Sequence, residues 1–176
     1  KIFFLVGNGG FACFFFKIAA EIVQTLKATF FCIGNNAEKH PEIVDEIRQN
    51  GHSVGIHGYS HVRGLYKKQE EYLNDIKKSE SIIKSKIFRP SHGRIYPSQV
   101  KKLNELGYKV VLWDVITRDY DASLKEEEVL KIAKKYSRNG SIVVFHDSLK
   151  AEKNMKYAFP LAVKYWLENG YTFETL

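Results

Sequence analysis

The sequence predicts an α/β fold built from parallel strands, and two observations support this. Short runs rich in β-branched and aromatic residues alternate with longer helical patterns along the whole 176-residue chain. Polar residues suited to chemistry come just after several of the predicted strands, at the edge where parallel α/β folds bind their ligands. Periodicity alone leaves two arrangements open: an open doubly wound sheet, or a closed barrel with fewer strands than the usual eight.

Seven strands are predicted, over residues 2–6, 28–33, 53–56, 86–88, 109–113, 141–145 and 171–173. Six helices are predicted between them, over residues 17–26, 41–50, 67–84, 97–106, 126–138 and 155–168. Pro41 and Pro97 suit a first helical turn, and glycines typical of helix ends follow at Gly51, Gly107, Gly140 and Gly170. No linker, internal repeat or break in composition is visible, so we expect one domain over residues 1–176.

The composition is that of an ordinary globular protein, with 44% hydrophobic and 27% charged residues. The apolar run over residues 11–16 is too short to span a bilayer, so no transmembrane segment is expected. A net charge of +7 raises the question of a nucleic acid or an anionic polymer as partner. The lysines alternate with acids along helical segments, as on solvated faces, so we expect no nucleic-acid partner. Cys13 and Cys32 form no disulfide framework and lie at no metal-ligand spacing.

Two histidines follow the predicted strand 53–56. If this turn is helical, His57 and His61 project from the same face, so both imidazoles can reach one ion. Neutral imidazole is a good ligand for Zn²⁺ and similar metals. The pair alone is weak evidence, because one capping and one surface histidine give the same pattern. Its place at the end of a strand favours a metal site.

Arg89 leaves strand 86–88 into a loop. A guanidinium there can orient a carboxylate, bind substrate oxygens or form a structural salt bridge. His92, in the same loop, either lines the cleft or faces solvent. Both residues are candidates for the site, because they follow a strand end.

Acids and aromatic residues surround the end of strand 109–113. A carboxylate here, from Asp114, Asp119 or Asp121, would hold a catalytic histidine in its working tautomer. Trp113 and Tyr120 either wall a sugar site or fill the core. His146 ends the apolar strand 141–145, and a histidine at a strand tip suits proton transfer better than core packing.

These segments, in this order, resemble the polysaccharide deacetylases of the NodB-homology type, a carbohydrate esterase family. The resemblance covers essentially the whole chain and rests on five ordered motifs. They are Ala28-Thr29-Phe30-Phe31 with residues 34–38, residues 51–61 with their His-x-x-x-His, Arg89-Pro90-Ser91-His92-Gly93, Trp113-Asp114-Val115 with Asp119-Tyr120, and Val144-Phe145-His146-Asp147.

The resemblance implies a distorted, TIM-barrel-like (β/α) barrel of about seven parallel strands that binds one divalent metal ion. Zn²⁺ is the expected metal, with Co²⁺, Ni²⁺ and Mn²⁺ as alternatives. The implied reaction is hydrolysis of N-acetyl, or O-acetyl, groups on a polysaccharide such as chitin oligomers or peptidoglycan. The resemblance also suggests an extracellular or cell-envelope protein, although no export signal is visible in the sequence.

The resemblance further assigns roles position by position. His57 and His61 match the metal histidines, His146 the general acid and Asp119 the acid that orients it. Arg89 matches the arginine that steadies the catalytic base. Three residues are expected at the substrate: Trp113, Tyr120 and His92.

The first motif departs from the family pattern. Thr-Phe-Asp-Asp-Gly-Pro is expected where this chain has Leu5-Val6-Gly7-Asn8-Gly9-Gly10. Gly7 then takes the place of the base aspartate and Asn8 that of the metal aspartate. Gly7 accepts no proton, and loss of a general base costs ~10²–10⁴-fold in rate. Asn8 offers the metal a neutral carbonyl oxygen instead of a charge.

Four interpretations follow from this departure. The chain is a working deacetylase in which Asp114 or Asp147 helps as base, or a pseudo-enzyme that binds glycan or metal without turnover. A third interpretation is that the first segment departs from the natural protein. The fourth is a basic interaction module with structural histidines, whose binding to an anionic polymer would weaken steeply with salt.

Overall fold

The computed structural model describes residues 1–8 and 26–176, without the side chains of residues 4–8. Contacts divide the chain into two compact units. The first comprises Lys1–Thr29 and Trp113–Leu176, and the second comprises Phe30–Leu112. Cys13, the apolar run 11–16 and almost all of the predicted helix 17–26 lie outside the described residues. The expectation of one domain stays a prediction.

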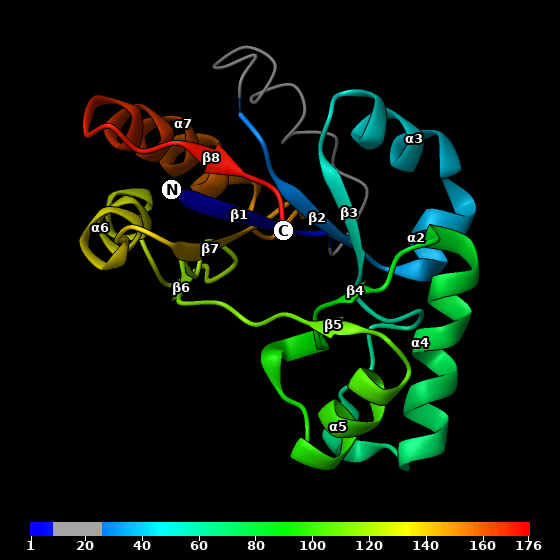
Figure 1. Ribbon diagram of the computed structural model, residues 1–176. Helices are drawn as coiled ribbons and strands as arrows, with labels where there is room; N and C mark the ends of the chain where they lie inside the picture. Colours follow the sequence, from blue (N-terminus) through cyan, green and yellow to red (C-terminus); the bar gives the residue numbers. More distant parts are fainter. Residues whose placement is uncertain (9–25) are drawn as a thin grey trace. The chain divides into compact units, whose positions relative to one another are not determined.

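The second unit is a row of parallel strands that helices connect along the chain (Figure 1). The strands run in the order β5 (Lys109–Val110), β4 (Ile87–Phe88), β3 (Ser53–Ile56) and β2 (Thr29–Cys32). The helices are α2 (Gly34–Lys39), α3 (Pro41–Gln49), α4 (Gln69–Ile83) and α5 (Pro97–Glu105). Because these strands are parallel, their carboxyl ends lie at one edge of the sheet. The predicted site residues of this unit come directly after those strand ends.

Local sequence explains these elements. Pro41 and Pro97 each open a helix, as predicted. A Cβ on Gly55 would lie 2.6 Å from the Phe31 ring, so β3 passes this buried ring only because it has glycine there. The inward face of α4 carries buried residues at helical spacing, among them Tyr72, Ile76 and Ile83.

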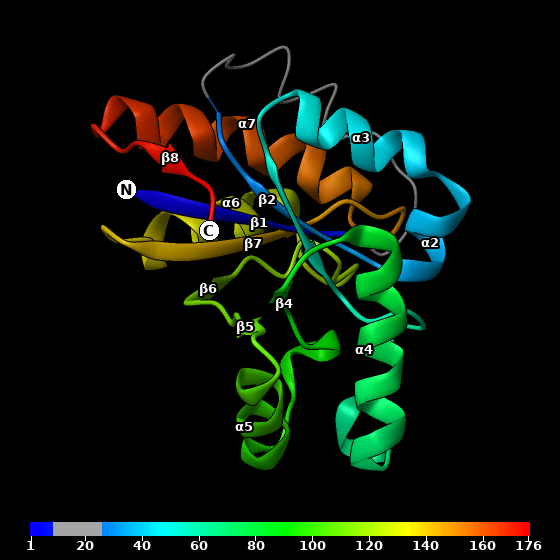
Figure 2. The same cartoon turned by 45° about the vertical axis from the view of Figure 1, so that its right-hand side comes forward.

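In the first unit, β1 (Ile2–Asn8) lies between β7 (Ser141–His146) and β8 (Phe173–Glu174), all parallel. Figure 2 shows β1 beside β7. β6 (Val115–Ile116) pairs with the other edge of β7. The helices α6 (Glu126–Tyr136) and α7 (Glu152–Glu168) pack against each other. Buried aromatic pairs stabilise this unit, with the rings of Phe145 and Phe159 edge to face at 5.3 Å.

The predicted elements that fall on described residues are confirmed with small shifts of their ends. Strand 109–113 is the main correction, because β5 ends at Val110 and a separate short strand, β6, begins at Val115. The sequence also missed α2, whose residues lack apolar periodicity. Among the helices that the structure describes, none combines the length and the hydropathy that a membrane span requires.

Candidate active site

The loop that carries His57 and His61 is not helical, so the helical spacing considered for the pair does not apply. His57 leaves β3 with its backbone N–H bonded to the Cys32 carbonyl at 2.9 Å. The chain then turns through left-handed conformations at Gly58 (φ +78°) and His61 (φ +53°). This turn, rather than helical spacing, brings the two imidazole rings to 4.9 Å between centroids.

Hydrogen bonds hold this loop from two sides. The Asp75 carboxylate on α4 accepts from the backbone N–H groups of Tyr59 at 2.8 Å and Ser60 at 3.1 Å. The first two N–H groups of α2 donate to the carbonyls of Gly58 and Tyr59, at 2.9 and 3.1 Å. Because the backbone is fixed in this way, both histidine side chains start from a fixed position.

The tautomer of His57 follows from its contacts. Ring Nδ1 lies 2.7 Å from the Arg89 carbonyl oxygen, which only accepts, so Nδ1 carries the proton. Ring Nε2 lies 3.2 Å from Arg89 Nη2, which only donates, so Nε2 presents its lone pair. A backbone carbonyl on Nδ1 is the kind of contact that orients metal-binding histidines for coordination through Nε2.

Arg89 is a buried cation, with 2% of its surface exposed. Burial lowers the pKa of its guanidinium to about 9. No described carboxylate forms an ion pair with it, and Nε has no hydrogen-bond partner in the described part of the chain. Its guanidinium carbon lies 5.4 Å from the centroid of the Phe31 ring. The structural salt bridge considered for Arg89 is therefore absent among the described residues.

His92 extends the histidine cluster, with its ring centroid 4.8 Å from that of His61. Its backbone φ of +58° lies inside the short 3₁₀ turn Ser91–Gly93. Burial, and then the charge of Arg63, lower the pKa of His92, and a hydrogen bond with the His61 backbone opposes them. His92 therefore lies beside the histidine pair, and contact with substrate stays a prediction.

The two imidazoles fit two positions in the coordination shell of a divalent metal, because their rings lie close together and His57 presents Nε2. No cluster of three or more His, Cys, Asp or Glu side chains that could hold an ion occurs within residues 1–3 and 26–176. Any further ligand would come from solvent or from a side chain outside that description. Asn8, the third ligand that the resemblance implies, ends β1, and because its side chain is not described its role stays a prediction.

A second cluster, in the first unit, is formed by His146 and Asp119. Asp119 is completely buried and accepts twice from His146, from the backbone N–H at 2.6 Å and from ring Nδ1 at 2.7 Å. Because the carboxylate holds the Nδ1 proton, Nε2 is the ring nitrogen that exchanges a proton. The structure thus brings together the two residues that the sequence predicted as acid and orienting acid.

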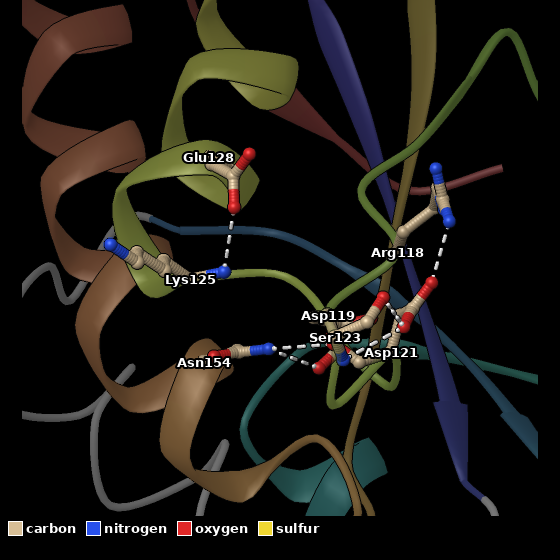
Figure 3. A network of polar contacts seen from close by, with 7 residues as sticks. All are labelled: Arg118, Asp119, Asp121, Ser123, Lys125, Glu128 and Asn154. Carbon is tan, nitrogen blue, oxygen red and sulfur yellow. Dashed lines mark hydrogen bonds and ion pairs between the residues drawn. The ribbon is translucent and has the colours of Figure 1, made fainter.

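The loop after β6 is fixed by a polar network (Figure 3). Asn154 on α7 donates to the carbonyl oxygens of Asp119 at 3.0 Å and Asp121 at 3.4 Å. Arg118 has a φ of +59° and pairs with the Asp121 carboxylate at 2.6 Å. The backbone around Asp119 is therefore fixed, and the buried carboxylate points at His146.

Of the aromatic and acidic residues predicted for this site, Tyr120 and Asp147 are neighbours of His146, whereas Trp113 and Asp114 lie level with the start of β7. Tyr120 lies edge-on to the His146 ring at 4.8 Å. Trp113 and Asp114 precede β6, and Asp114 accepts from the N–H of Ile142 near the start of β7. His146 ends the same strand, so Asp114 is at the wrong end of β7 to act as a base beside it. Asp147 directly follows His146 and is buried.

The backbone of β1 places the altered first motif. In the register of β1 with β7, Gly7 is opposite His146, and Asn8 is the last residue of the strand. Gly7 therefore lies level with the general acid candidate, at the carboxyl end of its strand. It has no side chain to accept a proton there.

Sequence reasoning missed Asp75 and Asn154, which position the two clusters without belonging to any motif. Asp75 sits on the same face of α4 as Tyr72 and Ser79, which are buried. An acid at the edge of an apolar helix face was the available signal. Nothing in the sequence, however, indicated that the N–H groups of the 57–61 loop would be its donors.

A protein-family model for polysaccharide deacetylase matches residues 23–111. A peptidoglycan-N-acetylglucosamine deacetylase of Bacillus cereus is 35% identical over 139 residues, which is 75% of this chain and 50% of that protein. Another protein of the same name and organism is 30% identical over 157 residues, 85% of this chain and 73% of that protein. The chain thus spans about half the length of the first relative.

The crystal structure of the Bc1960 peptidoglycan N-acetylglucosamine deacetylase, in complex with an N-hydroxybenzamide compound, matches with a TM-score of 0.92 and 28% identity. The match covers 100% of this chain and 86% of the chain in that crystal structure. The fold is therefore α/β with parallel strands, as in this deacetylase. The predicted distorted-barrel class and the resemblance are both confirmed.

Proposed function

Because the chain belongs to the polysaccharide deacetylase family, we propose that it removes acetyl groups from an N-acetylated glycan with the help of a divalent metal ion. The observation that carries the proposal is the contact between His146 and the buried Asp119, at 2.7 Å from ring Nδ1 to the carboxylate. The family is in general metal-dependent. A peptidoglycan substrate, as the names of the relatives suggest, would place the protein at the cell envelope.

We assign the metal to His57 and His61, with Asn8 as third ligand from the family resemblance. Zn²⁺ suits a pair of imidazoles, and Co²⁺, Ni²⁺ or Mn²⁺ are alternatives. A bound metal would supply Lewis-acid polarisation of the acetyl carbonyl and of a water molecule.

His146 acts as the general acid in this proposal. When the C–N bond of the N-acetyl group breaks, the leaving amine needs a proton, and the imidazolium of His146 donates it from Nε2. Asp119 keeps Nδ1 protonated throughout and stabilises the imidazolium by its charge. The ring of Tyr120 packs edge-on against His146 and would form one wall for the sugar. Trp113 precedes Asp114, level with the start of β7, so it lies away from His146. His92, beside the histidine pair, stays a predicted substrate contact.

The general base is missing from its usual position, because Gly7 has no side chain to accept a proton. Asp147 is the carboxylate closest along the chain to His146, and it is the residue that we propose takes part of this role. Turnover is therefore expected to be slow, ~10²–10⁴-fold below that of a chain with an aspartate at position 7.

Gly7 also favours a second candidate function, which is glycan or metal binding without turnover. Both candidates predict that affinity for a neutral N-acetylglucosamine oligomer changes little between low and high salt. A basic interaction module would instead lose affinity for an anionic polymer steeply as salt rises.

Acetate release from N-acetylglucosamine oligomers by the zinc-loaded chain tests the proposal. We expect slow release that His146→Ala abolishes and Gly7→Asp accelerates, while the control His40→Ala, at a half-exposed side chain, changes nothing. Oligomer binding with no release from any variant would support the second candidate. Release that survives in His146→Ala would contradict the assigned acid.

A further inference from the structure

The nitrogen of His57 that a metal would use is already engaged. Nε2 accepts a hydrogen bond from Arg89 Nη2 at 3.2 Å, while Nδ1 is held by the carbonyl of the same residue at 2.7 Å. Both ring nitrogens of His57 therefore contact Arg89. Because both residues are buried, water competes little for these contacts.

Metal binding at His57 would deprive Arg89 of a hydrogen-bond acceptor. The Nε2 lone pair serves either the guanidinium or the metal, so the hydrogen bond from Nη2 has to break. Arg89 Nε already has no partner among the residues that the structure describes, and Nη2 would lose its partner as well. Two positive groups would then lie close together in a region from which solvent is largely excluded.

No described acid offsets this charge. Arg89 forms no ion pair in the described part of the chain, and its other close neighbour is the face of the Phe31 ring. Asp75, the acid that holds the histidine loop, is engaged with the N–H groups of Tyr59 and Ser60. Among the described residues, the guanidinium is thus left with His57 as its side-chain acceptor.

We propose that Arg89 competes with the metal in this chain: its guanidinium occupies His57 Nε2 in the metal-free protein and weakens the binding of a divalent cation there. This inference rests on the proposed function only in taking His57 as a metal ligand. Under this proposal, removing Arg89 raises the affinity for the metal, whereas removing a residue that supports the site would lower it.

Zinc affinity, measured on the full chain by competition with a fluorescent chelator, tests this directly. We expect Arg89→Met to bind zinc about tenfold more tightly or better than the unchanged chain, since one charge-assisted hydrogen bond no longer has to break. Arg89→Gln removes the same charge with a polar side chain and is expected to bind more tightly too. Arg89→Gln replaces Arg89→Met in the test if thermal unfolding shows that Arg89→Met does not fold.

Arg94→Met is the matched control, since Arg94 is an exposed arginine that caps the same 3₁₀ turn. It is expected to leave zinc affinity unchanged, and a rise equal to that of Arg89→Met would overturn the proposal in favour of a general charge effect. Unchanged or weaker zinc binding in folded Arg89→Met and Arg89→Gln would also overturn it. Tighter zinc binding in these variants without acetate release would uphold the competition while the proposed activity fails.

Discussion

Replacing Asp119 by alanine removes the acceptor of two hydrogen bonds donated by His146. One comes from the backbone N–H at 2.6 Å and one from ring Nδ1 at 2.7 Å, and the carboxylate is completely buried. Hydrogen bonds to a charged group contribute roughly 1.5–3 kcal/mol each. The variant also avoids the cost of burying a carboxylate, which offsets part of that loss. We therefore expect the free energy of unfolding to fall by about 3–5 kcal/mol, the usual range for breaking a buried pair.

Urea unfolding followed by tryptophan fluorescence measures this loss. For a chain of this size each kcal/mol corresponds to about 2–4 °C, so the melting temperature should fall by roughly 6–20 °C. Asp45→Ala is the matched control, because Asp45 is 68% exposed and makes one long contact with Arg48 at 4.0 Å. It should stay within about 0.5 kcal/mol of the unchanged chain. A loss below about 1 kcal/mol for Asp119→Ala would refute the reasoning that this carboxylate holds His146.

Three further predictions concern the histidine loop and a surface carboxylate. Asp75→Asn turns one accepting oxygen into a donor, so one of the two loop N–H bonds is lost, and we expect zinc affinity to fall about tenfold in a metal titration. Gly58→Ala forces a Cβ onto a φ of +78° and to 2.9 Å from Asp75 Oδ2, so unfolding stability should fall by about 1–3 kcal/mol in urea melts; no loss would show that the turn adapts. Burial raises the pKa of Glu80, but hydrogen bonds from Lys86 and Tyr108 and the charge of Lys86 outweigh this and lower it. A lowered carboxyl pKa stabilises the fold above the unfolded pKa, and this stability is lost as pH falls through the folded pKa. The stability advantage over Glu80→Gln should therefore be full above pH ~4.5 and shrink as pH falls below it; an unchanged difference at pH 3 would contradict this.

The sequence predicted which strand ends carry the chemistry, because that follows from strand and turn signals alone. His57 directly follows β3, and His146 is the last residue of β7. The family resemblance predicted that Asp119 orients His146; the structure shows two hydrogen bonds between them, and their catalytic roles stay a prediction. Strand ends in a parallel fold meet at one edge, so such expectations need no side-chain geometry.

Other features were outside what the sequence could indicate. The turn through His61 needs a positive φ at a residue other than glycine, which no local propensity favours. β6 is two residues long in an acidic and aromatic stretch, so its strand signal was merged with that of the preceding strand. The contact between Arg89 and His57 Nε2 joins residues 32 positions apart and depends on burial, which a sequence pattern does not report.

The proposed function depends on a divalent metal held by the imidazoles of His57 and His61. Elemental analysis after loading with an excess of Zn²⁺ and removal of the unbound ion tests this most directly, on the unchanged chain, His57→Ala and Asn8→Asp. We predict about one zinc ion per chain, lost in His57→Ala and retained through longer washing in Asn8→Asp. Equal zinc in His57→Ala, or no zinc in any of the three, would contradict the site and leave the family's fold without its metal chemistry.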